Sequence, residues 1–277
     1  MKNLWNKKIA DEYIKKYANK NLSKNFGLRI YTTHLLGSEK KLVLHGGGNT
    51  SLKESQKDIF NKTINVMHVK GSGWDMSNLT EEGMPTVLLD PLKKTLEFNK
   101  MTDTVMVNFL RNNLINPLSS NPSVETLLHA FLPHRYIDHT HSNAILSLVN
   151  LNNSSSILKK IFGNKLAIIP YVMPGFDLAK KCSEIYNMDK KIEGLLLLNH
   201  GIFTFGKTAK ESYDRMIKYV TIAEKFIKKN KSKSKKINFL NKKNHNFDIG
   251  KIQNLCRKLF YDITKSKWII KHNHSKE

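Results

Sequence analysis

The sequence predicts an α/β protein of layered architecture, in which helices flank a central sheet. Short apolar segments of strand character recur along the chain, and segments with helical spacing of apolar residues lie between them. The run at 195–198 is apolar on both faces, as expected for a strand with a neighbour on each side. Strands and helices follow one another without a regular βαβ alternation. These observations favour one layered α/β domain over about residues 5–229.

Four segments of this domain carry helical spacing or helix-start signals. Thr102 or Asp103 can cap the second of them, and Asn121 followed by Pro122 places a cap and a proline at the first helical position of the third. The last is long and has apolar residues on one face. Helices are predicted over 5–27, 102–114, 121–132 and 208–229.

Six segments have strand patterns, and several of them end at glycine or proline. Two run directly into glycine-rich turns, and one carries the pair His139 and His141. Strands are predicted over 41–53, 64–75, 85–90, 136–150, 165–175 and 192–206.

The C-terminal fifth of the chain differs in composition from the rest. Residues 228–243 contain eight lysines and no acidic residue, which is typical of a solvated linker. The following residues up to 270 contain one short amphipathic helix pattern and a strand-like "KWII", too little for an independent domain. We therefore predict a main domain over 1–229, a basic linker over 230–246 and a short C-terminal segment over 247–277.

Composition narrows the class of protein. No apolar run approaches the roughly 18 residues needed to cross a bilayer, so no membrane partner is expected. The N-terminal segment is basic but has no apolar core of a secretory signal. The two cysteines, Cys182 and Cys256, lie far apart, which argues against a disulfide framework and favours the cytoplasm.

The net charge of +23 raises the question of nucleic-acid binding. Residues 228–277 carry 15 of the 46 Lys and Arg residues but only 3 of the 23 Asp and Glu residues. About half of the excess charge therefore lies in the tail, and the rest is thinly spread. No binding motif or pattern of stacking aromatic residues accompanies it, which argues against a nucleic-acid partner.

Three histidines are candidate metal ligands. His139 and His141 are two residues apart on a predicted strand, so both side chains point to one face. A bare His-x-His is also common as two ordinary polar residues of a turn. His200, which ends the buried strand and precedes Gly201, supplies a third imidazole. Three imidazoles that leave a position open are typical of a catalytic zinc site.

Glu125, in the first turn of the predicted 121–132 helix, is a candidate acid because this helix leads directly into the histidine-bearing strand. Taken alone, it is better explained as a solvent-facing glutamate favoured by the helix dipole. His129, four residues further on, is more often a packing or supporting residue than a ligand.

Two glycine turns are candidate anion sites. "GGGNTS" at 46–51 and "GSG" at 71–73 each follow a predicted strand, and each can direct backbone N–H groups toward an anion. Neither matches a Walker or dinucleotide motif. Separately they are as readily hairpin turns, whereas as a pair beside a metal site they indicate a phosphate pocket.

Five motifs in order along residues 5–229 resemble the class II aldolase/adducin family. They are "HGGGNTSLK", "VKGSGWD", "NPSVETLLHAFLPHRYIDHTHSNA", "PYVMPGFDLAK" and "LLNHGIFTFG" with "ESYDRM". They are most similar to the aldolase half of bifunctional rhamnulose-1-phosphate aldolase/short-chain dehydrogenase proteins. The resemblance implies a class II aldolase-like fold with a central mixed or antiparallel sheet flanked by helices.

The resemblance also implies site residues, a cofactor and an assembly. Zn²⁺ or another divalent metal would be held by the three histidines, with Glu125 as the acid/base residue and a phosphorylated sugar as substrate. A homo-oligomer, usually a tetramer, is implied as well. The family's metal ligands fall on His139, His141 and His200, and its phosphate-binding residues on Gly48, Asn49, Ser72, Gly73 and Ser123.

The implied reaction is the cleavage of a ketose 1-phosphate of the rhamnulose or fuculose type to dihydroxyacetone phosphate and an aldehyde. A pentulose-phosphate 4-epimerase, a thio-sugar phosphate dehydratase and a non-catalytic adducin-like binding protein are alternatives within the same fold. Tyr171 does not align clearly with the residue that family members borrow from a neighbouring subunit. The fused relatives continue into a dehydrogenase domain with a glycine-rich nucleotide motif, which this sequence lacks, and 247–277 resembles the start of their inter-domain region.

Overall fold

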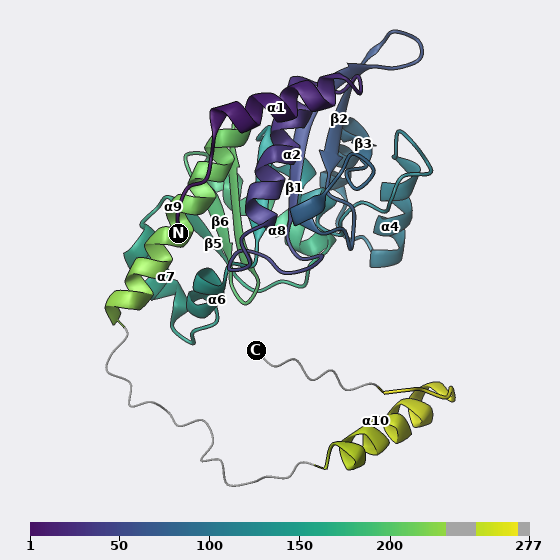
Figure 1. The fold of residues 1–277 in the computed structure, drawn as a ribbon, viewed down its shortest axis with the longest axis vertical. Helices are drawn as coiled ribbons and strands as arrows, with labels where there is room; N and C mark the ends of the chain where they lie inside the picture. The colour runs from purple at the N-terminus through teal and green to yellow at the C-terminus, as the bar shows by residue number, and fades with distance from the viewer. Residues whose placement is uncertain (231–247, 271–277) are drawn as a thin grey trace. The chain divides into compact units, whose positions relative to one another are not determined.

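A computed structural model describes residues 1–230 and 248–270 (Figure 1). The chain divides into two compact units, residues 1–230 and 231–277. Within the described ranges, no helix is both long enough and apolar enough to cross a membrane. The linker predicted over 230–246 falls, apart from Asn230, outside the described residues.

The first unit is built around a mixed sheet, whose seven strands run in the order β3-β2-β1-β4-β7-β6-β5. Only the pair β5 and β6 is parallel, and all other neighbours are antiparallel. The predicted α/β class with a mixed sheet is therefore confirmed. The strands are β1 (Asn49–Lys57), β2 (Thr63–Val69), β3 (Thr86–Leu88), β4 (Tyr136–Thr140), β5 (Leu166–Ile169), β6 (Gly194–Leu197) and β7 (Gly201–Gly206).

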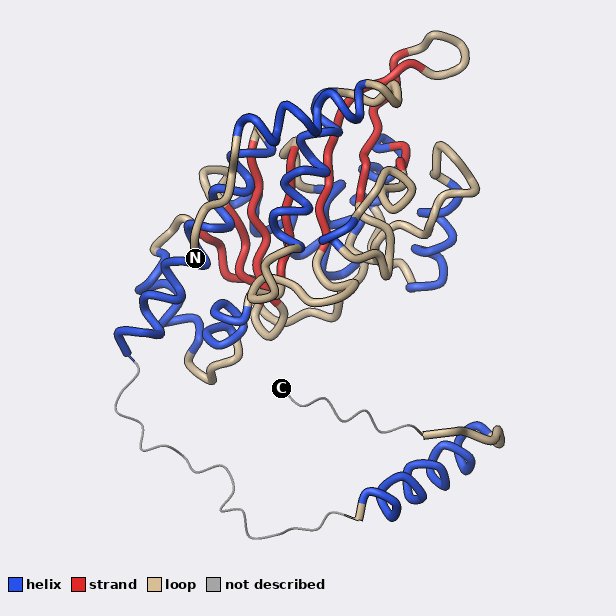
Figure 2. The backbone as a smooth tube through the Cα atoms, in the orientation of Figure 1, coloured by secondary structure: helices blue, strands red, loops and turns tan. Residues whose placement is uncertain are grey.

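Helices cover both faces of this sheet (Figure 2). The face that carries Tyr136 and Ile202 packs against α1, α2, α6, α7 and α9, whereas the face that carries Ile137 and Phe203 packs against α3, α4, α5 and α8. The helices of the first unit are α1 (Lys7–Ala18), α2 (Lys24–Gly37), α3 (Leu89–Lys94), α4 (Asp103–Asn112), α5 (Thr126–Phe131), α6 (Asn143–Val149), α7 (Ser154–Phe162), α8 (Phe176–Met188) and α9 (Ala209–Asn230).

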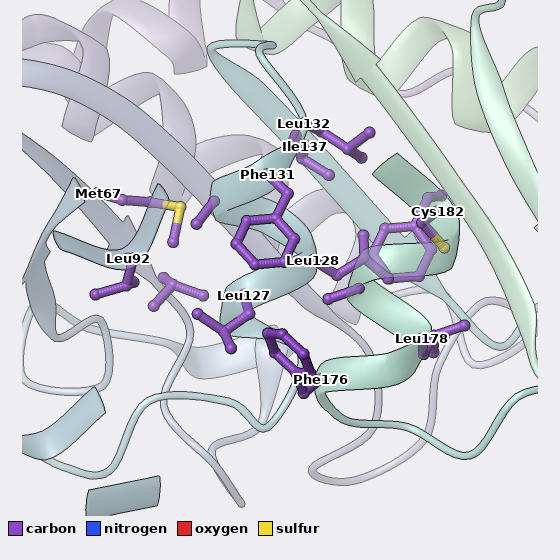
Figure 3. Close-up of a cluster of buried hydrophobic side chains, with 14 of the residues drawn as sticks. Met67, Leu92, Leu127, Leu128, Phe131, Leu132, Ile137, Phe176, Leu178 and Cys182 are labelled. Carbon is purple, nitrogen blue, oxygen red and sulfur yellow. The ribbon is translucent and has the colours of Figure 1, made fainter. Parts of the chain in front are cut away.

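The core between the sheet and α5 fixes the position of the helix that follows the candidate acid. Leu127, Leu128 and Phe131 of α5 are buried against sheet residues and against Phe176 of α8 (Figure 3). Phe131 and Phe176 meet edge to face with ring centroids 6.4 Å apart. Every residue of α5 is buried, so this short helix has little freedom to move relative to the sheet.

The opposite face of the sheet contains a buried ion pair. Asp138 on β4 points toward α2, where Arg29 Nη2 lies 2.5 Å from its carboxylate, and both side chains are completely inaccessible. The guanidinium also donates to Thr32 Oγ1 at 2.6 Å. Burial raises the pKa of Asp138, and the charge of Arg29 opposes this effect. The pair therefore ties α2 to the strand that carries His139 on its other face.

Two predictions for the N-terminal part are wrong. The predicted helix over 5–27 is two helices, α1 and α2, because the chain turns at Asn21 with a φ of 59° and Ser23 caps α2 by accepting a hydrogen bond from Phe26 N–H. The predicted strand over 41–53 begins only at Asn49, after the glycines. Leu42 and Val43 are apolar because they pack in the core and not because they pair in the sheet.

Three predicted segments need correction near the histidines. The helix expected over 121–132 begins at Thr126, because Pro122 instead forms a bridge with Gly71. The strand expected over 136–150 ends at Thr140, and α6 follows. The strand expected over 192–206 is two antiparallel strands, β6 and β7, joined by a tight turn.

The remaining predictions for the first unit identify the right type of element. The helix patterns of 102–114 and 208–229 correspond to α4 and α9, and the strand patterns of 64–75, 85–90 and 165–175 to β2, β3 and β5, although β2 ends at Val69 and β5 at Ile169, before the predicted ends. Thr102 caps α4 by accepting from Val105 N–H. In the second unit, α10 (Ile249–Thr264) is a helix, whereas 267–270 form no strand.

His134 gives a testable acid dependence of stability. Its ring stacks on Phe205 with centroids 3.9 Å apart, and burial lowers its pKa to about 4. The unfolded chain, whose histidines titrate near pH 6.5, binds a proton that the folded chain does not, so stability falls as pH decreases from about 6.5 to about 4. His134→Phe should remove this part of the loss, as measured by urea unfolding at several pH values. If the variant and the wild type lost equal stability over this pH range, His134 would not be the cause of the acid dependence.

Candidate active site

Three strand ends meet at one end of the sheet. β4 lies between β1 and β7 and is antiparallel to both, so its last residues pair with their first residues. Asn49 is opposite His139, and Thr140 is opposite Ile202. The start of α5 lies at the same place, because Glu125 approaches His139. This end of the sheet gathers the histidines and the acid predicted from the sequence.

His139 is the most firmly held of the three histidines. It is completely buried, and its ring stacks on Phe203 with centroids 4.0 Å apart. Its Nδ1 lies 3.0 Å from the carbonyl oxygen of Ile202. A carbonyl can only accept, so Nδ1 carries the proton and Nε2 keeps its lone pair. The neutral ring is thus fixed in the tautomer that a metal ligand requires, and burial keeps its pKa well below the usual range.

His141 and His200 direct their rings toward His139. The Nε2 atoms of His139 and His141 are 3.0 Å apart, and one ligand atom from each of the three residues lies within 4.8 Å of the others. Ligand nitrogens at a tetrahedral zinc, with bonds of about 2.0–2.1 Å, are separated by about 3.3 Å. Burial lowers the pKa of His141 and lowers that of His200 to about 4. All three rings are therefore neutral near pH 7, as metal ligands must be.

The tight turn between β6 and β7 brings His200 to the cluster. His200 N–H donates to the carbonyl of Leu197 at 3.2 Å, and Asn199 adopts a φ of 57°. Asparagine tolerates this left-handed conformation better than most residues, which explains the sequence "LNHG" at this turn. The turn sits at the end of the sheet beside the end of β4, so His200 reaches the two histidines at that end.

Glu125 is the acid nearest to the cluster. Its Oε1 lies 3.2 Å from His200 Nε2 and its Oε2 lies 3.5 Å from His139 Nε2. Only 6% of the residue is exposed. Burial raises the pKa of Glu125 to about 7, against the opposing effects of a hydrogen bond from Asn49 and the charge of Lys70. Glu125 lies just before the first turn of α5, and not within that turn as predicted.

The side chains present fit a divalent cation. Among the described residues, Oε1 of Glu125 and Nδ1 of His200 are buried without a hydrogen-bond partner. Unpaired buried polar atoms are costly unless something satisfies them. Three imidazoles and no thiolate form the donor set of an open zinc site more than of a closed structural one. The cluster thus supplies ligands for a cation, and a bound cation would account for unpaired polar atoms in the cluster.

The two glycine turns lie against each other beside the histidines. A Cβ on Gly46 would meet the carbonyl oxygen of Gly73 at 2.9 Å, and one on Gly48 would meet that of His139 at 2.7 Å. Gly48 also has a φ of 63°, so a side chain there would be strained as well as crowded. The glycine turn that precedes β1 is therefore pressed onto the end of β4. Ser72 and Gly73 are exposed, whereas Gly48 is buried.

The other two predicted phosphate residues lie between the turns and the acid. The Asn49 amide donates to Ser123 Oγ at 3.0 Å and to Glu125 Oε2 at 2.6 Å. Ser123 is linked to the second turn through its N–H, which donates to the carbonyl of Lys70 at 3.2 Å. All nine residues predicted for the site thus lie in one connected neighbourhood, although the Asn49 side chain is already engaged by Glu125.

Lys70 is a site residue that sequence reasoning missed. Its ammonium group is buried and donates to the carbonyls of Gly46, Gly71 and Trp74 at 3.0, 3.3 and 2.6 Å. It therefore joins both glycine turns and places a positive charge beneath them. Desolvation lowers its pKa to about 8, against the opposing charges of Asp75 and Glu125. The sequence signal that could have identified Lys70 is its position directly before "GSG".

Gly201 leaves the space that the cluster needs. A Cβ at this position would meet the Thr140 carbonyl oxygen at 2.6 Å and ring atoms of both His139 and His141 at 3.2 and 3.1 Å. We expect Gly201→Ala to displace the rings and weaken divalent-metal affinity by about 10- to 100-fold, measured by competition with a chelating dye. Gly250→Ala in α10, where the Cβ meets only the Asp248 carboxylate, is the control that should retain wild-type affinity. Unchanged affinity in Gly201→Ala would contradict this packing.

Fold and site together define an α/β protein with a candidate divalent-metal centre at one end of its sheet. Residues 29–227 match the family model described as the Class II Aldolase and Adducin N-terminal domain. The chain therefore belongs to the class II aldolase and adducin family, as its five motifs predict.

Known relatives agree with this assignment. The chain is 37% identical over 198 residues to the uncharacterized oxidoreductase YuxG of Bacillus subtilis, an alignment that covers 72% of this chain but only 29% of that protein. The N-terminal class II aldolase domain of a Thermoplasma acidophilum protein is 42% identical, covers 72% of this chain and 92% of its own, and superposes with a TM-score of 0.68. A Thermotoga maritima sugar-phosphate aldolase shares the fold at 16% identity, with 79% and 94% coverage and a TM-score of 0.54.

Proposed function

We propose that this chain is a zinc-dependent aldolase that cleaves a ketose 1-phosphate of the rhamnulose or fuculose type to dihydroxyacetone phosphate and an aldehyde. The observation that carries the proposal is the convergence of three neutral imidazoles, two of which lie within 3.5 Å of one buried carboxylate, beside two glycine turns. The class II aldolase family supports a metal-dependent reaction. The proposal includes a cytoplasmic location and a homo-oligomer of tetrameric type.

In this proposal His139, His141 and His200 hold the metal, which when bound supplies Lewis acidity to the substrate's ketone oxygen. Glu125 lies within 3.5 Å of two of these rings, so its carboxyl group can reach a carbon of a substrate bound beside the metal. When the C3–C4 bond breaks, its electron pair stays on C3, and Glu125 delivers a proton to that carbon. The C4 hydroxyl loses its proton to water as C4 becomes the aldehyde carbon, and Glu125 takes a proton back from water, so the protons balance.

The phosphate group is assigned to the paired glycine turns. Ser72 and Gly73 are exposed, so the Ser72 hydroxyl and the Gly73 N–H can be presented, and Gly48, Asn49 and Ser123 line the inner side near Glu125. Lys70 adds a fixed positive charge beneath both turns. Backbone donors and a buried cation together suit a phosphate dianion better than a neutral sugar hydroxyl.

Product analysis tests the reaction. The zinc-loaded protein is incubated with a panel of ketose 1-phosphates, and dihydroxyacetone phosphate is measured by reduction with a coupled dehydrogenase. Formation of dihydroxyacetone phosphate supports the aldolase. Recovery of an unbroken but epimerised pentulose phosphate would replace it with the 4-epimerase alternative, and absence of bound metal would favour the adducin-like binding protein.

Glu125→Gln should separate chemistry from metal binding. The amide keeps the shape of the carboxyl group but cannot transfer a proton, so kcat should fall on the order of 100-fold or more. The zinc content should stay at one ion per chain, because the three imidazoles are untouched. Steady-state kinetics and elemental analysis of the same preparation measure both quantities. A variant with wild-type kcat would remove Glu125 from the proposed chemistry.

A further inference from the structure

One buried histidine near the site has no role in the proposed reaction. His129 of α5 is completely inaccessible, and both of its ring nitrogens are bonded. Nδ1 lies 2.7 Å from Ser51 Oγ, and Nε2 lies 2.6 Å from Asn49 Oδ1. Its ring also packs edge to face against Phe203, on which His139 stacks. The His129 N–H donates to the Glu125 carbonyl at 3.2 Å, but its side chain bonds to residues around the acid and not to the Glu125 carboxyl group.

The direction of each hydrogen bond in this chain of contacts can be assigned. The Asn49 amide nitrogen lies 2.6 Å from Glu125 Oε2, and an amide nitrogen only donates, so Glu125 accepts. The amide oxygen of Asn49 then faces His129, and because this oxygen only accepts, His129 Nε2 must carry the proton. Burial holds the pKa of His129 well below its usual range, so the ring is neutral and Nδ1 is bare. Nδ1 accepts from the Ser51 hydroxyl.

The two orientations of the Asn49 amide have nearly the same shape, so packing alone does not select between them. If the amide rotated by half a turn, its NH₂ group would face His129 Nε2 at 2.6 Å, and a protonated Nε2 would then oppose another donor. A protonated Nε2 on His129 favours the observed orientation, because it needs an acceptor opposite it. Ser51 in turn favours the tautomer of His129 that provides this proton.

We propose that His129 is a positioning residue: its Nε2–H fixes the Asn49 amide so that Asn49 donates to Glu125 and holds that carboxyl group beside His139 and His200. This inference rests on the proposed function in one respect, which is that Glu125 is the acid/base residue. His129 acts through Asn49 and touches neither substrate nor metal. Its effect on the reaction therefore depends on Asn49 being present.

The tautomer is tested directly and without any activity measurement. Long-range ¹H–¹⁵N spectra of the full chain labelled at histidine distinguish a protonated Nε2 from a protonated Nδ1, and the signals of His129 are assigned by their loss in His129→Gln. We expect the Nε2–H form near pH 7. The Nδ1–H form would overturn the proposal, because His129 could then not donate to Asn49.

A double-mutant cycle tests the effect on catalysis. His129→Leu should lower kcat by about 10- to 100-fold with little change in KM and with one zinc retained per chain. Because His129 acts through Asn49, the double variant with Asn49→Ala should be no slower than Asn49→Ala alone. His129→Gln, whose amide can donate to Asn49, should recover most of the lost rate. Additive losses in the cycle would overturn the proposal.

A matched control separates positioning from general packing. His34 of α2 is also bonded at both nitrogens, to Tyr13 Oη and to the Leu79 carbonyl, each at 2.7 Å, but has no link to Asn49. His34→Leu should lower stability and leave kcat unchanged. If His129→Leu fails to fold, the tautomer of His129 in the wild type and the kcat of His129→Gln decide whether His129 positions Asn49. If the wild type cleaves no ketose 1-phosphate, the proposed function fails, and the tautomer alone decides the positioning.

Discussion

Replacing His139 with alanine should abolish zinc retention and lower the rate of ketose 1-phosphate cleavage by about 1000-fold or more. His139 contributes the central imidazole, whose bare Nε2 lies 3.0 Å from that of His141. Removal leaves two ligands, and the stabilisation that a metal gives to developing charge is worth several kcal/mol. Elemental analysis after dialysis and steady-state kinetics of the zinc-supplemented variant measure the two effects.

The control for this experiment is another histidine substitution outside the cluster. His134 stacks on Phe205 and is not among the residues whose ligand atoms converge. His134→Phe should therefore retain one zinc per chain and wild-type turnover. If His139→Ala also retained stoichiometric zinc after dialysis, the three histidines would not form the metal site.

Arg29→Met should destabilise the protein by about 3–5 kcal/mol, because it leaves the Asp138 carboxylate buried without its partner. Both side chains of this pair are inaccessible, and the Arg29 guanidinium lies 2.5 Å from Asp138. The methionine fills most of the same volume, so the loss reports the uncompensated charge more than a cavity. Urea unfolding of the variant, with the transition followed by circular dichroism, measures it.

The matched control removes both charges. In Arg29→Met combined with Asp138→Leu, apolar side chains replace the whole pair, and this exchange is often neutral or stabilising for buried pairs. We expect the double variant to recover most of the stability lost by the single variant. If the single variant were as stable as wild type, the ion pair would not anchor α2 to β4.

The elements that sequence alone predicted well are those whose pattern is complete within one segment. α9 has apolar residues on one face over 22 residues, and Thr102 caps α4 through a contact three residues away. Such local signals do not depend on partners elsewhere in the chain. They were predicted to within a few residues for this reason.

The wrong boundaries arise where distant segments decide the structure. Pro122 is an acceptable first residue of a helix, yet it bridges to Gly71, and α5 begins four residues later. The apolar residues at 42–43 resemble a strand but pack beneath α2 and α6 instead. In both cases a contact with a remote segment overrides the local preference, which single-sequence patterns do not contain.

The same distinction applies to the site. The three histidines and Glu125 stand in motifs, so their gathering is predictable from the order of residues along the chain. For His129 the sequence predicts only a packing or supporting residue, and for Lys70 nothing, because their partners depend on which carbonyls and amides lie opposite these side chains in space. A residue that works through its neighbours leaves no spacing pattern in the sequence.

The pairing of β4 with β7 also constrains the order of events during folding. His139 and Ile202 are 63 positions apart, yet their contact is what fixes the tautomer of His139, and the adjoining turn supplies His200. Closing so long a loop is slow compared with forming local helices. Zinc binding during refolding should therefore lag behind the recovery of the helical circular-dichroism signal. A metal-sensitive dye that follows zinc uptake would then report when β4 and β7 have paired.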